Sequence, residues 1–515
     1  PVKIVPKDSK STTTPAERFQ KRESEELVVA FSGPVGSGVG LVIDEAEAML
    51  KGIGYDVEKI KLSNLIKKIG EKDTDISGIL DKLTKVTRYD KLQLAGNALR
   101  SKYGQDILAE LAITQIALHR TAKASPEASV GDIVPTRTAY LIDQLKHPAE
   151  VALLRTVYGN LFYLIGVLAS YNQRKKNLRG DGLSESEAEN VMERDHREDI
   201  EHGQQLDKTL KLADLFIRNN HSNRGSLSRQ LKRFFGLIHG ENGITPTMHE
   251  YAMYVAYAAG LKSACLSRQV GAAISDSTGN IIATGCNDVP KALGGLYTEA
   301  DNEKDHRCVN LEGGKCFNDH HKALLTEEIK AILGKHGIPG EKIISISKEI
   351  RYTTALRDLI EYSRSVHAEM DALTSVARTG GISVKNGYLY TTTFPCHNCA
   401  RHIIAAGIVR VFYIEPYEKS LALTLHDDAI VQDPDDGEGQ SNKVQFLHFE
   451  GVAPRKYQNF FYPVHERKDA DGKAIFKPIN KSLKVVPQYL DSYKDLETKV
   501  AEHLNEIGFS AEILQ

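Results

Sequence analysis

Two short motifs constrain the fold most, because their side chains have to meet at one point. His367 opens the motif His-Ala-Glu, and Cys396 and Cys399 lie further along the chain in Pro-Cys-His-Asn-Cys. One imidazole and two thiolates supply three zinc ligands and leave the fourth tetrahedral position for water, as in catalytic rather than structural zinc sites. The fold therefore has to bring these two distant segments together.

Both motifs stand at predicted helix starts. Met370, Leu373 and Ala377 are spaced for one face of a helix that follows His367. The residues after the second cysteine have the composition of a helix that stops at Gly407. Both sulfurs are then expected in a first helical turn, where unpaired N–H groups and the positive helix end favour thiolate over thiol.

Glu369 follows the histidine by two residues and is placed to move a proton between water and a leaving group. The pattern H-x-E…P-C-x-x-C is typical of zinc deaminases that act on cytosine or adenine. A redox Cys-x-x-Cys pair has no matching His-x-Glu upstream, and a structural zinc would need a fourth protein ligand, for which glutamate is uncommon. We predict a hydrolytic deaminase with Glu369 as the catalytic residue and one zinc ion on His367, Cys396 and Cys399.

Length and composition set wider limits. A chain of 515 residues exceeds the size at which single cores stop growing, about 250–300 residues, so more than one domain is expected. The apolar content of 41% and charged content of 26% are those of a soluble globular protein, and the net charge of −2 excludes a globally basic nucleic-acid coat. Six cysteines in so long a chain do not form a disulfide framework.

No apolar run approaches the roughly 18–20 residues that span a bilayer. Residues 1–26 are polar and lack the apolar core of a signal peptide, so we expect a flexible leader and a cytoplasmic protein with no membrane partner.

Residues 27–240 predict an α/β domain on a parallel sheet. The buried-strand pattern Leu27–Ser32 runs into a glycine-rich loop and then an apparent helix over 41–51. Strand, glycine loop and helix form the context of a phosphate-binding loop, whose N–H groups turn toward phosphate oxygens. A later strand over 138–143 ends in an acidic residue, as a Walker B strand does. The candidate nucleotide-binding residues are Gly33, Gly36, Ser37, Gly38 and Asp143.

The loop departs from the P-loop pattern at two positions. Val39 and Gly40 stand where that pattern has its lysine and its magnesium-binding hydroxyl. In layout this half resembles the P-loop nucleotide and nucleoside kinases, but without the lysine phosphoryl transfer is not expected. A nucleotide sensor, a docking surface or an oligomerisation scaffold fits better, and a glycine loop that merely turns a strand into a helix is the alternative.

Linker-like stretches at 219–226 and 240–243 precede a second domain, expected over 245–515. Its pattern predicts a helix over 248–263, a hairpin over 270–285, and strands over 388–393 and 409–414. Together with the two zinc helices, these elements make a mixed sheet between helices. The predicted fold is a three-layer α/β/α domain.

Over 245–430 the chain resembles the deoxycytidylate deaminase family. The resemblance rests on the two zinc motifs, on Arg268-Gln-Val-Gly-Ala and on Gly285-Cys-Asn-Asp-Val-Pro. It implies a cytidine-deaminase-like fold and a role for Asn287 near the sugar and base of a nucleotide. An asparagine after a strand can instead be only a turn residue, and both interpretations stay open.

The fusion to a P-loop-like domain and the C-terminal extension narrow the resemblance to the bacterial antiphage dCTP deaminases. This implies deamination of free deoxycytidine nucleotides, dCTP to dUTP and dCMP to dUMP, in a homo-oligomer, with a second nucleotide at the N-terminal domain and a regulatory RNA as further candidate partners. The candidate substrate-binding residues are Asn287, Arg268, Tyr417, Lys419, Arg455 and Lys456.

Two other functions compete with this one. A polynucleotide deaminase uses the same zinc chemistry but needs a basic channel with interleaved aromatics, which the sequence does not show. A non-catalytic nucleotide-sensing or RNA-regulated module would not need the intact Glu369.

The second domain also contains an insert over 299–364 that could hold a second, structural zinc ion. Its Cys-x7-Cys spacing is not that of a standard knuckle, so we favour no second metal. An insert of this size can alternatively cover the pocket or form a subunit interface. The candidate ligands are His306, Cys308, Cys316, His320 and His321.

Overall fold

The computed structural model describes residues 24–84, 87–123, 135–197, 203–220, 224–311, 313–417, 420–434, 442–463, 466–476, 479–481 and 490–509. It divides into two compact units. The first unit joins residues 1–245 to residues 458–515, and the second unit is 246–457. None of the helices within these ranges is both long and apolar enough to cross a bilayer.

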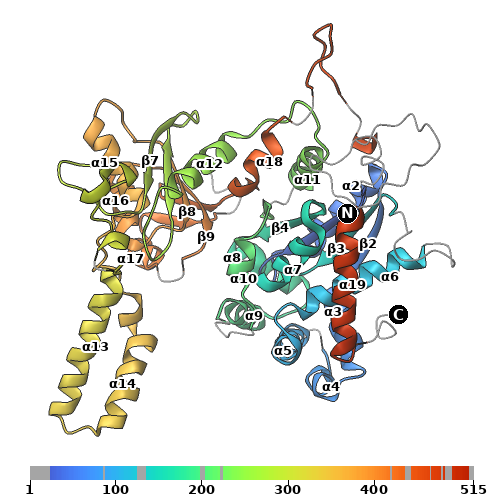
Figure 1. The fold of residues 1–515 in the computed structure, drawn as a ribbon, viewed down its shortest axis with the longest axis horizontal. Coiled ribbons are helices and arrows are strands. Elements are labelled where there is room, and N and C mark those ends of the chain that lie inside the picture. Colours follow the sequence, from blue (N-terminus) through green and yellow to red (C-terminus); the bar gives the residue numbers. More distant parts are fainter. Residues whose placement is uncertain are drawn as a thin grey trace, which may run out of the picture. The chain divides into compact units, whose positions relative to one another are not determined.

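The first unit is built on a parallel sheet (Figure 1), as the sequence predicts. Its order is β5-β4-β1-β3-β2, and β1, β3 and β4 are almost wholly buried. Phe31 of β1 lies opposite Asp143 of β3, so the glycine loop and the acidic strand end share one edge of the sheet. The strands are β1 (Leu27–Ser32), β2 (Asp56–Lys61), β3 (Thr138–Asp143), β4 (Phe162–Leu168) and β5 (Leu215–Arg218).

Helices surround this sheet. They are α2 (Val39–Gly52), α3 (Leu62–Gly70), α4 (Thr74–Leu80), α5 (Thr87–Tyr103), α6 (Ile107–Ala122), α7 (Pro148–Tyr158), α8 (Tyr171–Gly180), α9 (Glu185–Arg197), α10 (Leu206–Leu210), α11 (Arg224–Ile238) and α19 (Leu490–Glu506).

The C-terminal helix α19 belongs to the first unit, where it packs on α6 and α7. The Arg120 guanidinium of α6 is buried between the carboxylates of Glu26 and Glu497, with N–O distances of 2.8 Å and 3.0 Å. The Tyr493 hydroxyl donates to Ser24 and Glu26. A buried guanidinium needs such partners, and they come from the two ends of the chain.

These contacts correct two predicted boundaries. The second unit begins at Pro246, one residue after the predicted start, but it ends at Tyr457 rather than at residue 515. Residues 24–26, predicted as the end of a flexible leader, are part of the packed first unit, with Ser24 and Glu26 buried. The remainder of the predicted leader, 1–23, lies outside the described residues.

The second unit contains a mixed sheet of order β10-β11-β9-β8-β6-β7. The predicted hairpin is the antiparallel pair β6–β7; β6 also pairs antiparallel with β8, and the remaining pairs are parallel. β10 and β11 were not expected from the sequence. The strands are β6 (Gly271–Ser275), β7 (Ile281–Cys286), β8 (Tyr388–Thr393), β9 (Arg410–Glu415), β10 (Ile430–Gln432) and β11 (Val444–His448), and a short β12 (Gly451–Val452) follows.

Two glycines show that helices cover both faces of this sheet. A Cβ on Gly271 would lie 1.9 Å from the carbonyl oxygen of Ala256 in α12 (Met248–Gly260), and one on Gly285 would lie 2.2 Å from that of Ala368 in α15 (Ala368–Thr379). Gly285 pairs with the residue after Gly271, so the two glycines face opposite sides. The predicted three layers are confirmed, with α12 on one face and α15 on the other (Figure 1).

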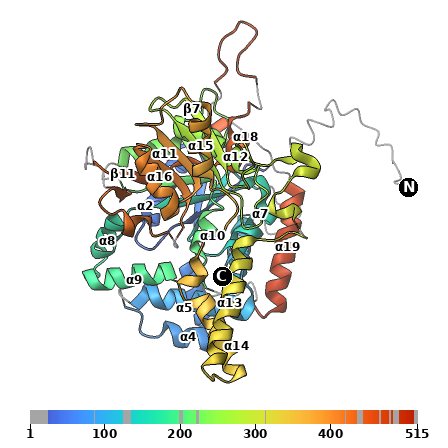
Figure 2. The same cartoon turned by 90° about the vertical axis from the view of Figure 1, so that its left-hand side faces the viewer.

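Further helices complete this unit: α16 (His397–Ala405), α17 (Ala422–Leu425), η6 (Pro454–Lys456) and the first residue of α18 (Tyr457–Phe461). The insert contains η3 (Glu299–Lys304), η4 (Cys308–Asn310), α13 (Phe317–Lys335), α14 (Gly340–Thr353) and η5 (Ala355–Asp358). α13 and α14 pack side by side as a hairpin that extends away from the unit's own sheet (Figures 1 and 2).

Candidate active site

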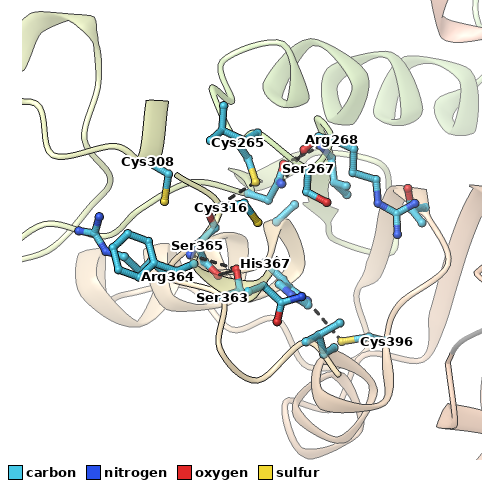
Figure 3. Close-up of a pocket in the computed structure, with 18 of the residues that line it drawn as sticks. Cys265, Ser267, Arg268, Cys308, Cys316, Ser363, Arg364, Ser365, His367 and Cys396 are labelled. Atoms are coloured by element: carbon cyan, nitrogen blue, oxygen red, sulfur yellow. Dashed lines mark hydrogen bonds between the residues drawn. The ribbon is translucent and has the colours of Figure 1, made fainter. Parts of the chain in front are cut away.

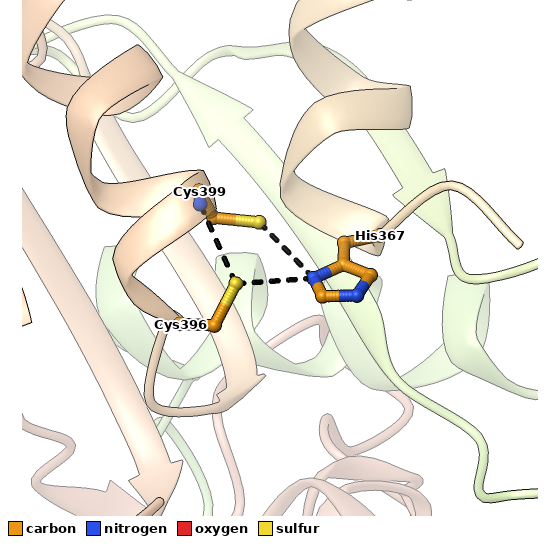
Figure 4. Close-up of side chains that lie close together, drawn as sticks. All are labelled: His367, Cys396 and Cys399. Carbon is orange, nitrogen blue, oxygen red and sulfur yellow. Dashed lines mark hydrogen bonds between the residues drawn. The ribbon is translucent and has the colours of Figure 1, made fainter. Parts of the chain in front are cut away.

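The three predicted metal ligands meet in the second unit (Figure 4). Nδ1 of His367 lies 3.3 Å from Sγ of Cys396 and 3.4 Å from Sγ of Cys399. The three ligand atoms all lie within 4.8 Å of one another. One imidazole nitrogen and two sulfurs at this spacing fit a tetrahedral zinc ion and leave one position open.

Helix starts place these side chains, as the sequence predicts. His367 is the N-cap residue of α15, and Cys396 is the N-cap residue of α16. The Cys396 sulfur accepts a hydrogen bond from the N–H of Cys399 at 3.4 Å. Gly407, with φ of 79°, follows α16 in the left-handed conformation that glycine tolerates and ends the helix.

The pKa values of the two cysteine thiols are shifted in opposite directions. A hydrogen bond from Cys399 lowers the pKa of the Cys396 thiol to about 4, and the same interaction raises the pKa of Cys399. The hydrogen bond with Cys396 raises the pKa of the His367 imidazole. One thiolate is therefore already favoured, and metal binding would displace the remaining protons from the site.

Glu369 lies in the first turn of α15 and is 4% exposed. It lines a cavity of about 160 Å³ together with His367 and Cys396. Burial raises the pKa of the Glu369 carboxyl, which suits a group that accepts a proton and gives it up again.

Asn287 lines the same cavity and also has a structural role. Its Oδ1 accepts from the N–H of Val270 at 2.6 Å, and its Nδ2 donates to the carbonyl of Arg268 at 2.8 Å. The amide therefore holds the segment before β6 against the end of β7, as a turn residue would. It retains a lone pair and a second N–H, so the substrate-binding interpretation remains a prediction.

Arg268 and Tyr417 also line the cavity. The guanidinium lies over the tyrosine ring at 4.9 Å and within 4.0 Å of the Glu415 carboxylate. Its side chain is 40% exposed, so it can meet a charged group that enters from solvent.

Two of the other predicted substrate cations do not line this cavity. Arg455 and Lys456 form part of η6, which packs on α12, and neither is among the described residues that line the cavity. This follows from the topology, because α12 covers one face of the sheet, whereas α15 and its N-cap residue His367 lie on the other face. Lys419 lies outside the described residues.

The two ends of the insert form part of the cavity wall, and neither Cys265 nor Arg364 was singled out from the sequence as a residue of that wall. Cys265, Cys308 and Cys316 gather there, and Arg364 lies beside them (Figure 3). The one available signal was the position of the insert directly before His367. The insert therefore covers part of the pocket, which was one of its expected roles.

The histidines and cysteines of the insert do not assemble into a metal-binding group within the described part of the chain. His306 packs edge-on against Tyr297, and His321 stacks on Tyr362 at 5.1 Å.

The first unit brings together four of the five residues predicted to bind a nucleotide. They line one cavity of about 840 Å³ at the carboxyl edge of the sheet: Gly36, Ser37 and Gly38 come from the loop, and Asp143 from the end of β3. Gly33 is not among the described residues that line this cavity, although its carbonyl accepts a hydrogen bond from the cavity residue Lys146 at 2.9 Å.

Comparison with known proteins identifies the family to which the second unit is similar. Residues 246–415 match the model of the cytidine and deoxycytidylate deaminase zinc-binding region. The deoxycytidylate deaminase of Enterobacteria phage T2 is 30% identical over 173 residues, 33% of this chain and 80% of that protein. The chain belongs to the deoxycytidylate deaminase family. The corresponding phage T4 enzyme is 28% identical over 173 residues, 33% of this chain and 78% of that protein.

Family membership and the ligand geometry agree on the chemistry: the chain is a hydrolytic deaminase with a zinc-binding region, in which His367, Cys396 and Cys399 could hold the metal ion. A solved dCMP deaminase from the cyanophage S-TIM5, in complex with dCMP and dUMP, is 18% identical and covers 40% of this chain and 100% of that one. The TM-score of this pair of structures is 0.24.

Proposed function

We propose that this deaminase acts on free deoxycytidine nucleotides, converting dCMP to dUMP and dCTP to dUTP with release of ammonia. The buried Glu369 beside the His-Cys-Cys group, in a cavity that also carries the Arg268 guanidinium, is the observation that supports this most directly. The base would enter toward Glu369, and the phosphates would remain near the exposed guanidinium.

The reaction replaces the exocyclic amino group at carbon 4 of cytosine with oxygen from water. A zinc ion held by His367, Cys396 and Cys399 would lower the pKa of a water molecule to about 7 and so supply a nucleophile at neutral pH. Glu369 would accept one proton from the attacking water and return it to the departing amine, so that ammonia leaves and the carboxylate is restored. The proton left on the new hydroxyl group moves to ring nitrogen 3, which gives the uracil ring. Burial of the carboxyl keeps bulk water from taking over that transfer.

The wider role that we propose is depletion of the deoxycytidine nucleotide pool in antiviral defence. It is supported by the likeness of this two-part chain to the antiphage dCTP deaminases. A homo-oligomer and a regulatory RNA partner belong to the same proposal.

One experiment separates the substrate classes. Ammonia release from dCMP, dCTP and a cytosine-containing single-stranded oligonucleotide is measured side by side with the full chain. We expect turnover of both mononucleotides and none of the oligonucleotide. Turnover of the oligonucleotide alone would show a polynucleotide deaminase instead. Measuring cellular dCTP during infection, with Glu369→Gln as the inactive control, tests the defence role.

A further inference from the structure

We propose that the α13–α14 hairpin joins copies of this chain, with an outer face of α13 in one copy packed antiparallel against an outer face of α14 in a second copy. The inference rests on the homo-oligomer proposed above and names its surface. Its test measures assembly rather than deamination, so it can fail while the proposed activity stands.

The hairpin carries more apolar side chains than its own seam buries. α13 and α14 pack on each other and extend away from the sheet of their unit (Figures 1 and 2). None of the apolar side chains of these two helices is buried, and the side chains that are buried belong to Lys322, Thr326 and Ser347. Helices in proteins obtain most of their stability from the packing of an apolar face, so a further packing partner would stabilise this hairpin.

On α13, one apolar set lies away from the seam. Leu324 and Ile332 are 45% and 55% exposed, and the exposed Glu328 stands midway between them. Residues four apart lie only about 40° apart around a helix, so these three side chains form one narrow stripe, the α13 stripe. The less exposed Ile329 and Leu333 lie about 100–140° from the centre of this stripe.

α14 repeats this pattern with the opposite charge. Ile344 and Tyr352 are 53% and 57% exposed, and the exposed Lys348 stands midway between them. These three side chains form the α14 stripe. The less exposed Ile346 and Ile350 lie about 160° from its centre. Each stripe is therefore apolar at both ends and charged in the middle.

The two stripes are complementary when their helices run antiparallel. Both have a spacing of four residues, about 6 Å along the helix, so the acidic centre of one meets the basic centre of the other. Neither Glu328 nor Lys348 has an ion-pair partner within the described part of the chain. Opposite charges that face each other across an interface fix its register and exclude other pairings. The apolar contacts on either side of this charge pair are Leu324 with Tyr352 and Ile332 with Ile344.

This complementarity identifies the partner as a second copy. Within one hairpin the two stripes do not meet, since their apolar residues are about half exposed while α13 and α14 pack through other residues. One chain nevertheless carries both halves of the contact. Exposed apolar residues grouped in this way mark interaction sites, and identical chains that carry both halves can bind each other.

Analytical ultracentrifugation of the full chain over a range of concentrations tests the proposal. We expect the wild type to associate, and Glu328→Lys and Lys348→Glu each to weaken association at least about tenfold, because each places like charges opposite each other. A wild type that stays monomeric at all concentrations would overturn the proposal. An oligomer that neither charge reversal weakens would overturn this surface and leave the homo-oligomer itself in place.

Charge exchange provides the decisive comparison. The double variant Glu328→Lys/Lys348→Glu should associate like the wild type, because it restores opposite charges across the contact. A double variant that associates no better than the two single variants would overturn the pairing of the stripes. Glu349→Lys, at an exposed position about 100° further around α14, is the control and should associate normally. Circular dichroism confirms that each variant is folded, and ammonia release from dCMP is measured separately.

Discussion

At the scale of single residues, Glu369 separates proton transfer from metal binding. Its carboxyl lies in the cavity but outside the group of three ligands, so Glu369→Gln should keep zinc and lose activity. General acid–base catalysis contributes about 10²- to 10⁴-fold, and we expect a loss of at least that size in kcat. Ammonia release and zinc content are measured on the same sample. Glu349→Gln, at an exposed position of α14, is the control and should keep normal activity. Normal turnover by Glu369→Gln would contradict the assignment of Glu369 as the proton-transfer residue.

The cysteines differ in what they do for the metal. Cys396→Ser should remove both zinc and activity, since it takes away a thiolate and the hydrogen bond to His367. Cys308→Ser, in the cavity wall, should leave the zinc content of the wild type unchanged. Elemental analysis of the three purified proteins checks this. A fall from two zinc ions to one in Cys308→Ser would instead reveal a second site in the insert.

Arg268 should distinguish phosphorylated from unphosphorylated substrates. It is the exposed cation on the cavity wall beside Tyr417, so Arg268→Ala should raise KM for dCMP and dCTP more than for deoxycytidine. Arg455→Ala, in η6 on the other face of the sheet, should change none of the three values. Steady-state kinetics with each of the three substrates measures these KM values. Equal effects of Arg268→Ala on all three would mean that the guanidinium does not meet phosphate.

At the scale of secondary-structure elements, α19 is attached to α6 by a pH-sensitive pair. His503 lies 2.9 Å from the Glu110 carboxylate, which raises the pKa of the imidazole, and burial raises the pKa of Glu110. A raised folded-state pKa contributes stability below the unfolded value, near 6.5 for histidine, and that contribution is lost as pH rises through the folded value. Both groups therefore make the attachment weaker as pH increases from acidic to alkaline.

Thermal unfolding at about pH 5.5 and about pH 8.5 measures this effect. The difference in Tm between wild type and His503→Gln should be present at the lower pH and small at the higher one. The effect should be modest because the His503 side chain is 47% exposed. A Tm difference that is the same at both pH values would show that the pair does not carry the pH dependence.

At the scale of the whole molecule, two segments far apart in the sequence, residues 24–26 and helix α19, complete the first unit. Arg120→Met would leave the buried carboxylates of Glu26 and Glu497 facing each other without a cation. Breaking a buried pair in this way costs roughly 3–5 kcal/mol, to be measured by urea unfolding. Arg179→Met, near the end of α8, is the control. An unchanged free energy of unfolding in Arg120→Met would show that the cluster does not hold the ends in place.

The chemistry of the zinc site could be predicted from the sequence because it depends on local order. His367, Glu369, Cys396 and Cys399 occur at helix starts, and capping, helix-stop glycine and hydrophobic spacing are properties of neighbouring residues. The parallel strands β1 and β3 and the hairpin β6–β7 were predictable for the same reason, since a short apolar run indicates a buried strand.

Only the tertiary structure decided which distant groups share a surface. The return of 458–515 to the first unit depends on a guanidinium that meets carboxylates from both chain ends, and no local pattern encodes that meeting. Arg455 and Lys456 lie in η6, which packs on α12 at the opposite face of the sheet, so they do not line the cavity. Arg364, at the end of the insert, does line it. Lys146, which follows the neighbouring strand β3, lies beside the glycine loop. Contacts of this kind arise from the packing of whole elements, where the loss of chain entropy is offset by burial and by charges that find partners far away in the sequence.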